Sequence, residues 1–130
     1  MQGEIMKAIK IAMVGAALVW SASAYAAGDP VKGEQVFKQC KICHQVGPTA
    51  KPGVGPVQNN VVGSKAGTRP GFNYSEAMKN SGLTWDEATL DKYLENPKAI
   101  VPGTKMVFVG LKNPQDRADV IAFLATQHGQ

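Results

Sequence analysis

The segment Cys40-Lys41-Ile42-Cys43-His44 constrains this chain more than any other, because it forms a Cys-x-x-Cys-His motif. This motif is typical of covalent attachment of a c-type haem, in which two thiols add to the vinyl groups and the histidine faces the iron. On a helical turn, positions i, i+3 and i+4 share one face, so the three side chains can meet one flat ring. The motif therefore predicts one haem c, attached through Cys40 and Cys43.

Other interpretations of the two cysteines have to be weighed against haem attachment. A thioredoxin-type dithiol would follow a strand, whereas the segment Val31 to Gln39 has a helical pattern. A zinc site needs four ligands, and outside the motif the sequence offers only His128 and no further cysteine. A disulfide between Cys40 and Cys43 would close too short a loop to add much stability. The haem interpretation is therefore favoured.

The first 26 residues have the pattern of an export signal. Two lysines precede an apolar run over residues 11–20, and Ala24-Tyr25-Ala26 offers small residues for cleavage near Ala26. Residues 22–24 are a second possible cleavage site. An uncleaved membrane anchor is the alternative, but a membrane span needs about 20 apolar residues. We therefore expect a signal peptide over residues 1–26 and export to the periplasm.

Residues 27–130 have the length of one small domain. The full chain has a formal net charge of +4, which falls to about +3 without the first 26 residues. No basic run or nucleic-acid-binding motif accompanies this charge, so we expect no nucleic-acid partner. A mild positive charge suits docking onto an acidic protein surface.

Helical patterns joined by glycine- and proline-rich connections predict an all-α fold. Asp29-Pro30 is a helix start, Thr84-Trp85-Asp86-Glu87 is a capping box that opens another helix, and Asn113-Pro114-Gln115-Asp116 caps the last one. Residues 47–71 hold six glycines and four prolines and predict a long loop that wraps around something. The apolar stripes of the second and last helices are Leu90, Tyr93 and Leu94, and Val120, Ile121, Phe123 and Leu124.

The second iron ligand of such a haem is often methionine. After residue 26, the sequence contains Met78 and Met106 alone. Met106 follows Pro-Gly-Thr-Lys, an irregular stretch whose backbone can come close to a flat ligand, whereas Met78 lies in a short predicted helical turn. Because methionine is usually core filler, the residues alone make Met106 a weak candidate.

Three segments together resemble class I cytochrome c: the Cys-x-x-Cys-His motif, Tyr93-Leu94-Glu95-Asn96-Pro97-Lys98, and Pro102-Gly103-Thr104-Lys105-Met106. The resemblance runs from Gly33 to Leu124 and is to mitochondrial cytochrome c and its close bacterial periplasmic relatives. It implies a small single-domain fold in which helices and loops wrap around one covalent haem.

The resemblance also implies roles for individual residues. His44 and Met106 would be the iron ligands, the Pro56 carbonyl would accept the Nδ1 proton of His44, and Tyr93 would hydrogen-bond the Met106 sulfur. The residues at positions that hydrogen-bond the haem propionates are Tyr74, Trp85 and Thr104. Those where the first helix crosses the last are Gly33, Phe37 and Phe123, and Phe108 matches an aromatic beside the exposed haem edge. Without the resemblance, core roles would be favoured for Trp85 and Tyr93.

Two positions depart from the family pattern. Ser64 stands where an arginine commonly reaches a propionate, and Met78 stands where an asparagine commonly joins the same polar network. Both changes remove polar support near the propionates. Arg69 or Lys65 could fold inward and supply the missing charge.

The resemblance implies an electron carrier rather than an enzyme, shuttling single electrons with His/Met-ligated iron, without catalytic residues or a small-molecule substrate. Its partners would be electron-donor and electron-acceptor proteins: membrane redox complexes, dehydrogenases or a reaction centre. They would dock onto a monomer at a haem edge ringed by Lys98, Lys105 and Lys112. The alternatives are a peroxidase or gas-binding protein with an open iron position, and a haem-free protein.

Overall fold

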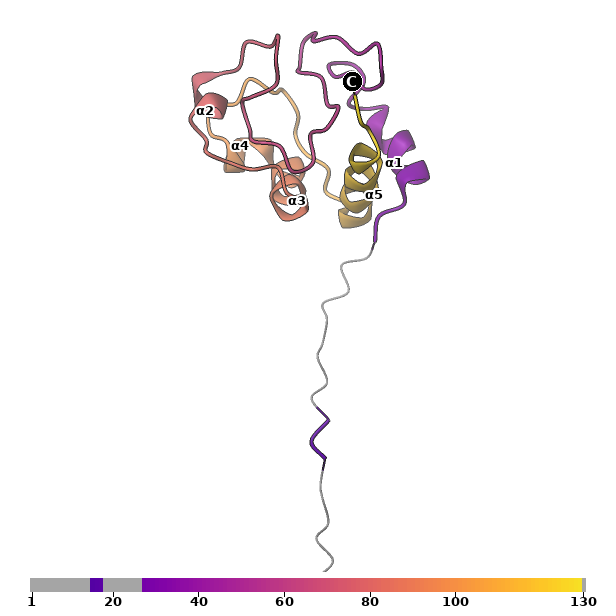
Figure 1. Cartoon of the computed structure of the whole chain (residues 1–130). Coiled ribbons are helices and arrows are strands. Elements are labelled where there is room, and N and C mark those ends of the chain that lie inside the picture. Colours follow the sequence, from indigo (N-terminus) through magenta and orange to yellow (C-terminus); the bar gives the residue numbers. More distant parts are fainter. Residues whose placement is uncertain (1–14, 18–26, 130) are drawn as a thin grey trace, which may run out of the picture.

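The computed structural model describes residues 15–17 and 27–129. It contains α1 (Pro30–Phe37), α2 (Glu76–Lys79), α3 (Glu87–Glu95), α4 (Pro97–Ile100) and α5 (Pro114–Ala125) (Figure 1). Within those ranges the only β-type pairing is an isolated bridge between Lys65 and Thr84, so the all-α prediction is confirmed. No helix in the described ranges is long and apolar enough to cross a membrane. The predicted signal peptide lies almost entirely outside the described residues.

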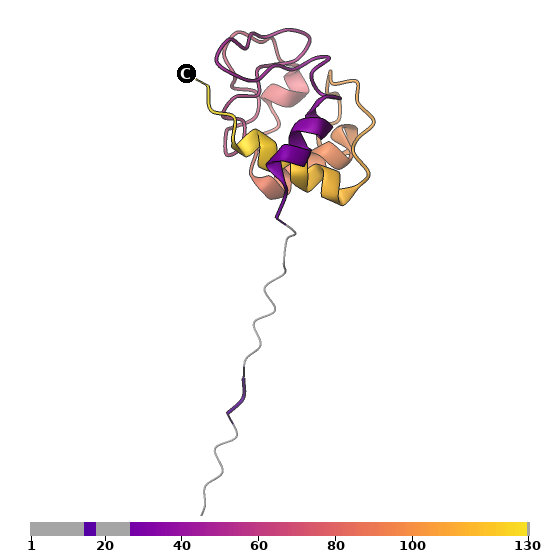
Figure 2. The same cartoon turned by 90° about the vertical axis from the view of Figure 1, so that its right-hand side faces the viewer.

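Helices α1 and α5 cross in close contact, and Figure 2 shows α1 lying over α5. Gly33 makes this approach possible, because a Cβ there would lie 1.9 Å from the backbone oxygen of Asp119. Beside it, the rings of Phe37 and Phe123 pack with centroids 5.2 Å apart. The crossing predicted for Gly33, Phe37 and Phe123 is therefore present in the structure.

The start of α1 is also joined to α5 by polar and backbone contacts. Asp29 caps α1 as predicted, because its side chain accepts from the backbone of Val31 and Lys32. The Asp29 backbone N–H in turn donates to the buried Asp119 carboxylate on α5, at 2.8 Å. Gly28 also touches α5, since a Cβ there would lie 1.9 Å from the Ala118 oxygen.

The predicted start of α3 was wrong by two residues. The helix is capped by Asp86, whose carboxylate accepts from the Thr89 N–H at 2.7 Å, and not by Thr84. Trp85 cannot lie in the helix because its backbone N–H donates to Ser64 and its carbonyl accepts from Gly63. These long-range bonds hold residues 84 and 85 extended, so the helix begins after them.

The remaining elements surround the α1–α5 crossing. Asn96 ends α3 and caps the short α4, whose first residue is Pro97. As predicted, Asn113 caps α5. Residues 38–75 lie between α1 and α2, and they include the long loop predicted over residues 47–71. The buried core consists of Phe37, Val61, Ala66, Trp85, Leu90, Tyr93, Leu94, Val101, Leu111, Val120, Ile121, Phe123 and Leu124.

Candidate haem site

A cavity of about 560 Å³ lies between the helices and the irregular segment. Every candidate site residue lines it: Cys40, Cys43, His44, Pro56, Tyr74, Trp85, Tyr93, Thr104 and Met106. Most of the other walls are apolar, with Phe37, Leu90 and Leu94 among them. The cations on the wall are Lys65, Arg69 and Lys105, and none of the described residues that line the cavity is Asp or Glu. A large, flat, apolar molecule that carries acidic groups fits these walls.

The cysteine motif follows α1 on tight turns rather than inside the helix. The Cys43 N–H donates to the Cys40 carbonyl at 3.1 Å, and the His44 N–H donates to the same oxygen at 2.9 Å. The second bond is the i to i−4 bond of an α-helical turn, so the three side chains still share one face. Burial, with a smaller effect of neighbouring Cys43, raises the pKa of the Cys40 thiol to about 11.

The His44 ring is held by the segment that follows the motif. Its Nδ1 atom lies 2.8 Å from the Pro56 oxygen and 2.8 Å from Gln58 Nε2. One nitrogen cannot both donate to the carbonyl and accept from the amide, so these contacts belong to different tautomers. Gln58 Nε2 can donate to Pro56 oxygen instead, at 3.3 Å. Donation from Nδ1 to Pro56 leaves the lone pair on Nε2, as a metal ligand requires.

The absence of a side chain at Gly55 leaves room for the imidazole of His44. A Cβ at Gly55 would lie 2.4 Å from Cε1 of His44, so any side chain there would displace the ring. Burial lowers the pKa of His44, and the hydrogen bond to the Pro56 backbone opposes that effect in part. The ring is therefore kept neutral at neutral pH, which is the form that binds iron.

Met106 is positioned from α3 through Tyr93. The Tyr93 hydroxyl donates to the Met106 sulfur at 3.4 Å and also lies 3.4 Å from Thr104 Oγ1. Thr104 Oγ1 accepts from the Met106 backbone N–H at 3.2 Å. Burial raises the pKa of Tyr93, so its hydroxyl stays protonated and able to donate. These bonds fix both the backbone and the sulfur of Met106.

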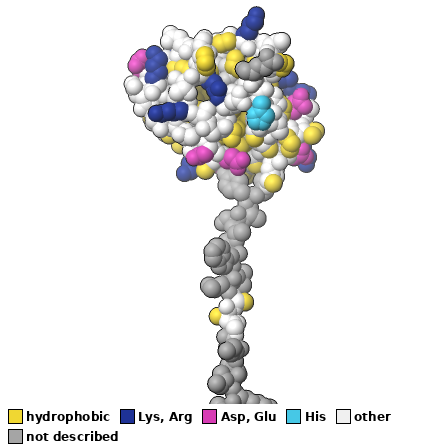
Figure 3. Space-filling view, viewed as in Figure 1, with side chains coloured by type: hydrophobic (Ala, Val, Ile, Leu, Met, Phe, Trp, Pro, Cys, Tyr) yellow, Lys and Arg dark blue, Asp and Glu magenta, His cyan; other side chains and the backbone are white. Residues whose placement is uncertain are grey.

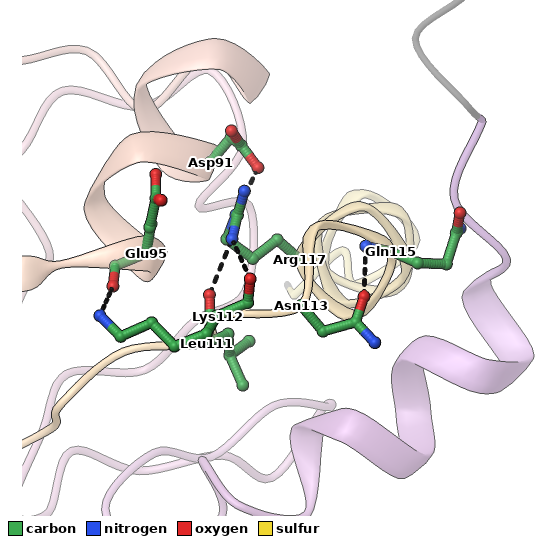
Figure 4. Close-up of polar contacts among 7 residues, drawn as sticks. All are labelled: Asp91, Glu95, Leu111, Lys112, Asn113, Gln115 and Arg117. Atoms are coloured by element: carbon green, nitrogen blue, oxygen red, sulfur yellow. Dashed lines mark hydrogen bonds and ion pairs between the residues drawn. The ribbon is translucent and has the colours of Figure 1, made fainter.

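The segment after Met106 is anchored between α3 and α5 (Figure 4). The backbone N–H of Leu111 donates to the Leu94 oxygen at 2.7 Å. The Lys112 ammonium donates to the Glu95 oxygen at 2.7 Å. From α5, the buried Arg117 reaches the Leu111 oxygen at 2.8 Å and the Lys112 oxygen at 3.2 Å.

The polar wall of the cavity differs from the family pattern as the sequence indicated. Tyr74, Trp85 and Thr104 all face the cavity, and Met78 lines it in place of a polar residue. Ser64 does not line it, because its hydroxyl donates to the Val61 oxygen at 2.7 Å. Arg69 and Lys65 do line it, as the sequence left open.

Sequence reasoning missed Gly55, Gln58 and Arg117. Gly55 and Gln58 lie in a loop without periodicity, so only their contact with His44 identifies them. Arg117 follows the capping residues of α5 and has the sequence signal of an ordinary surface cation. Its burial, with 7% of its surface exposed, could not be inferred from that pattern.

The mouth of the cavity is apolar, and Lys105 is the one of the three lysines expected around it that lines the cavity. Ile42, Val54 and Val107 line the cavity and are also exposed, Val107 to 97%. The three lysines expected around it, Lys98, Lys105 and Lys112, are all exposed. The Lys105 ammonium also donates to the backbone oxygen of Asn73, and the Lys112 ammonium donates to that of Glu95. On the face drawn in Figure 3, most Lys and Arg side chains lie over the upper half with apolar side chains between them, and others lie near the lower edges.

Comparisons with known proteins agree with these features. The family model described as cytochrome c matches residues 30–128. A cytochrome c2 of Rhodomicrobium vannielii is 98% identical over 96% of this chain and 100% of its own length. Among solved structures, cytochrome cH from Methylobacterium extorquens has a TM-score of 0.73 at 48% identity, covering 77% of this chain and 100% of that one. Cytochrome c2 from Rhodospirillum centenum has a TM-score of 0.74 at 42% identity, covering 78% and 99%.

Proposed function

We propose a ligand set, a docking face and a cellular location for this chain, which belongs to the cytochrome c family. Its members are electron carriers rather than enzymes, and they hold haem c through the cysteine pair, here Cys40 and Cys43. The haem supplies an iron that gains and loses one electron. The protein's part is to attach the group, supply two ligands, exclude water and present one edge to a partner.

In this proposal His44 and Met106 would be the two protein ligands that hold the haem iron. The contact between His44 Nδ1 and Pro56 supports the first ligand, because it directs the lone pair of the ring to Nε2. The hydrogen bond from the Tyr93 hydroxyl to the Met106 sulfur supports Met106 as the second ligand, because it holds this thioether on the cavity wall in one orientation.

Tyr74, Trp85 and Thr104 are proposed to hydrogen-bond the carboxylates of the haem. All three line the cavity, and two of them also support neighbouring site residues. The Trp85 ring packs against Tyr93 with centroids 4.7 Å apart, and Thr104 binds the Met106 backbone. A polar contact on these side chains would therefore tie the haem to the residues that orient Met106.

Partners of this electron carrier are proposed to dock at the mouth of the cavity, where Ile42, Val54 and Val107 are exposed. An apolar centre with surrounding lysines favours a partner with an apolar patch inside an acidic rim. Lys98, Lys105 and Lys112 are the cations that would steer it. The partners would be donor and acceptor complexes, and the carrier would act as a monomer.

The chain is also proposed to work in the periplasm after removal of residues 1–26. The support is the basic start, short apolar run and small residues around Ala26. The folded domain would then be residues 27–130. N-terminal sequencing of the protein from a periplasmic fraction tests this, and a chain that begins at Met1 would contradict it.

The ligand assignment is tested by comparing Met106→Ala with Met78→Ala in the haem-containing protein. Both methionines line the cavity, so the two variants lose the same group from the same walls. Met106→Ala is expected to abolish the sulfur-to-iron charge-transfer absorption and to let imidazole bind. Met78→Ala is expected to keep the absorption band. The assignment is wrong if the band survives in Met106→Ala.

A further inference from the structure

Arg69 has an unpaired donor at the wall of the cavity. Its Nε is the one buried side-chain nitrogen or oxygen that lacks a hydrogen-bond partner among the described residues. A buried polar group without a partner is unfavourable, and it is most unfavourable on a charged side chain. Nε is covered by protein atoms, so a molecule bound in the cavity would contact the guanidinium through its two Nη atoms.

The guanidinium of Arg69 is held in place beside the cavity. Its Nη2 donates to the backbone oxygen of Asn60, and its backbone N–H donates to the Tyr74 hydroxyl at 3.1 Å. Burial raises the pKa of Tyr74, while the bond from Arg69 and the nearby Arg69 charge oppose that effect. The positive charge therefore lies next to a tyrosine that also lines the cavity.

The Nη edge of the guanidinium suits a carboxylate. Each Nη carries two hydrogens, so Nη2 keeps one donor besides its bond to Asn60. Together with Nη1 it presents two parallel donors, which match the two oxygens of a carboxylate. None of the described cavity residues is Asp or Glu, so the wall supplies no carboxylate of its own. The partner must then come from a bound molecule.

We propose that Arg69 binds a carboxylate of the haem and takes the role that an arginine at the position of Ser64 commonly has in this family. Ser64 cannot provide it, because its hydroxyl is bound to Val61 and it does not line the cavity. The proposal rests on the proposed function, since it assigns one more contact to the same group.

Lys65 and Lys105 are the other cations on the cavity wall. Both are exposed residues, and the Lys105 ammonium donates to the Asn73 backbone, whereas Arg69 is half-buried and anchored at Asn60. A charge that is less screened by water acts more strongly on the iron. Arg69 is therefore expected to affect the iron more than Lys65.

The test is the reduction potential of four haem-containing variants. A cation near the iron favours the reduced form, which carries one more negative charge, so Arg69→Gln should lower the potential. The expected change is about fivefold in the equilibrium constant for reduction, where tenfold corresponds to about 59 mV for one electron. Lys65→Gln should change it less, and Lys32→Gln on the exposed face of α1 should not change it. The double variant Arg69→Gln/Ser64→Arg should recover part of the loss.

Equal potentials for Arg69→Gln and Lys32→Gln would overturn the proposal, as would a larger effect of Lys65→Gln. If Arg69→Gln fails to fold, Arg69→Lys serves instead, because it keeps the charge and loses the paired donors. It should give a smaller drop in potential, and an unchanged potential would count against paired binding. A haem stain on the denatured wild-type protein distinguishes a failure of the Arg69 proposal from a failure of the proposed function. If the stain is absent, the proposed function itself is contradicted.

Discussion

The Nε atom of Arg117 lies 2.7 Å from Asp91 Oδ1 and joins α5 to α3 through a largely buried ion pair (Figure 4). The same guanidinium holds the carbonyls of Leu111 and Lys112. This pair therefore fixes the far end of the segment that carries Met106, while Tyr93 fixes the near end.

Replacing Arg117 should destabilise the protein strongly. Arg117→Met leaves a carboxylate and two carbonyls without their donor, and removal of one partner of a buried pair costs about 3–5 kcal/mol. The control is Lys79→Met, which breaks an exposed pair with Glu76 and should cost less than about 1 kcal/mol. Denaturant unfolding of both haem-containing variants measures the difference. Similar losses would show that the Arg117 network contributes little.

Gly33→Ala should destabilise the protein, although alanine is the better helix former by about 1 kcal/mol. The new Cβ would lie 1.9 Å from the Asp119 oxygen, so α1 and α5 must separate. We expect a net loss of about 1–3 kcal/mol in the free energy of unfolding. Gly53→Ala is the control, because the nearest atom to its new Cβ is 3.8 Å away. A neutral or stabilising Gly33→Ala would mean that the crossing is loose.

Asp119 should make the protein sensitive to acid. The backbone N–H of Asp29 is the largest cause that lowers the pKa of Asp119, followed by the Gln115 side chain. A carboxylate with a lower pKa in the folded state stabilises it above the unfolded pKa of about 3.9, and this is lost as pH falls through the folded pKa.

Asp119→Asn should therefore have a lower free energy of unfolding than the wild type at pH 7, and this difference in stability should become smaller below about pH 4. Unfolding in urea at pH 7, 5 and 3 gives the comparison. Glu34→Gln, which changes an exposed carboxylate on α1, is the control. If the difference in stability between the wild type and Asp119→Asn stays constant with pH, the charge of the Asp119 carboxylate does not contribute.

Electron transfer with an acidic flavoprotein should slow as salt rises, because the Debye length shrinks from about 30 Å at 0.01 M to about 10 Å at 0.1 M. Lys98→Glu and Lys105→Glu should each lower the second-order rate at low salt more than Lys32→Glu does. Stopped-flow kinetics over this salt range measures the rates. If the three reversals act equally, partners do not dock at the cavity mouth.

Much of the helical frame could be predicted from local signals. Asp29 and Asn113 cap helices where the sequence placed them, because their side chains satisfy backbone N–H groups only two or three residues away. The capping box at Thr84 was misleading for the opposite reason. Trp85 is bonded to Ser64, twenty-one residues earlier, and no local pattern reveals such a partner.

Part of the candidate site could likewise be predicted from the sequence, and part could not. The cysteine motif is local, so its shape followed from spacing, and the resemblance supplied Met106 and Tyr93. The residues that orient these groups act across the fold: Gly55 against the His44 ring, and Arg117 behind the Met106 segment. Glycine and arginine are common residue types, and these two have a role in the site only because of their contacts in the folded protein.

The contact of Gly28 with α5 has a consequence for the order of events after export. A cut after Ala26 would leave only Ala27 ahead of Gly28. Gly28 lies so close to α5 that a Cβ on it would overlap the backbone oxygen of Ala118. A protease needs several extended residues on each side of the bond it cleaves, and on the C-terminal side Gly28 and Asp29 are held against α5 in the folded domain. If the leader is removed at Ala26 as proposed, cleavage and folding would compete for these residues, and a domain that folded first would hinder the cut.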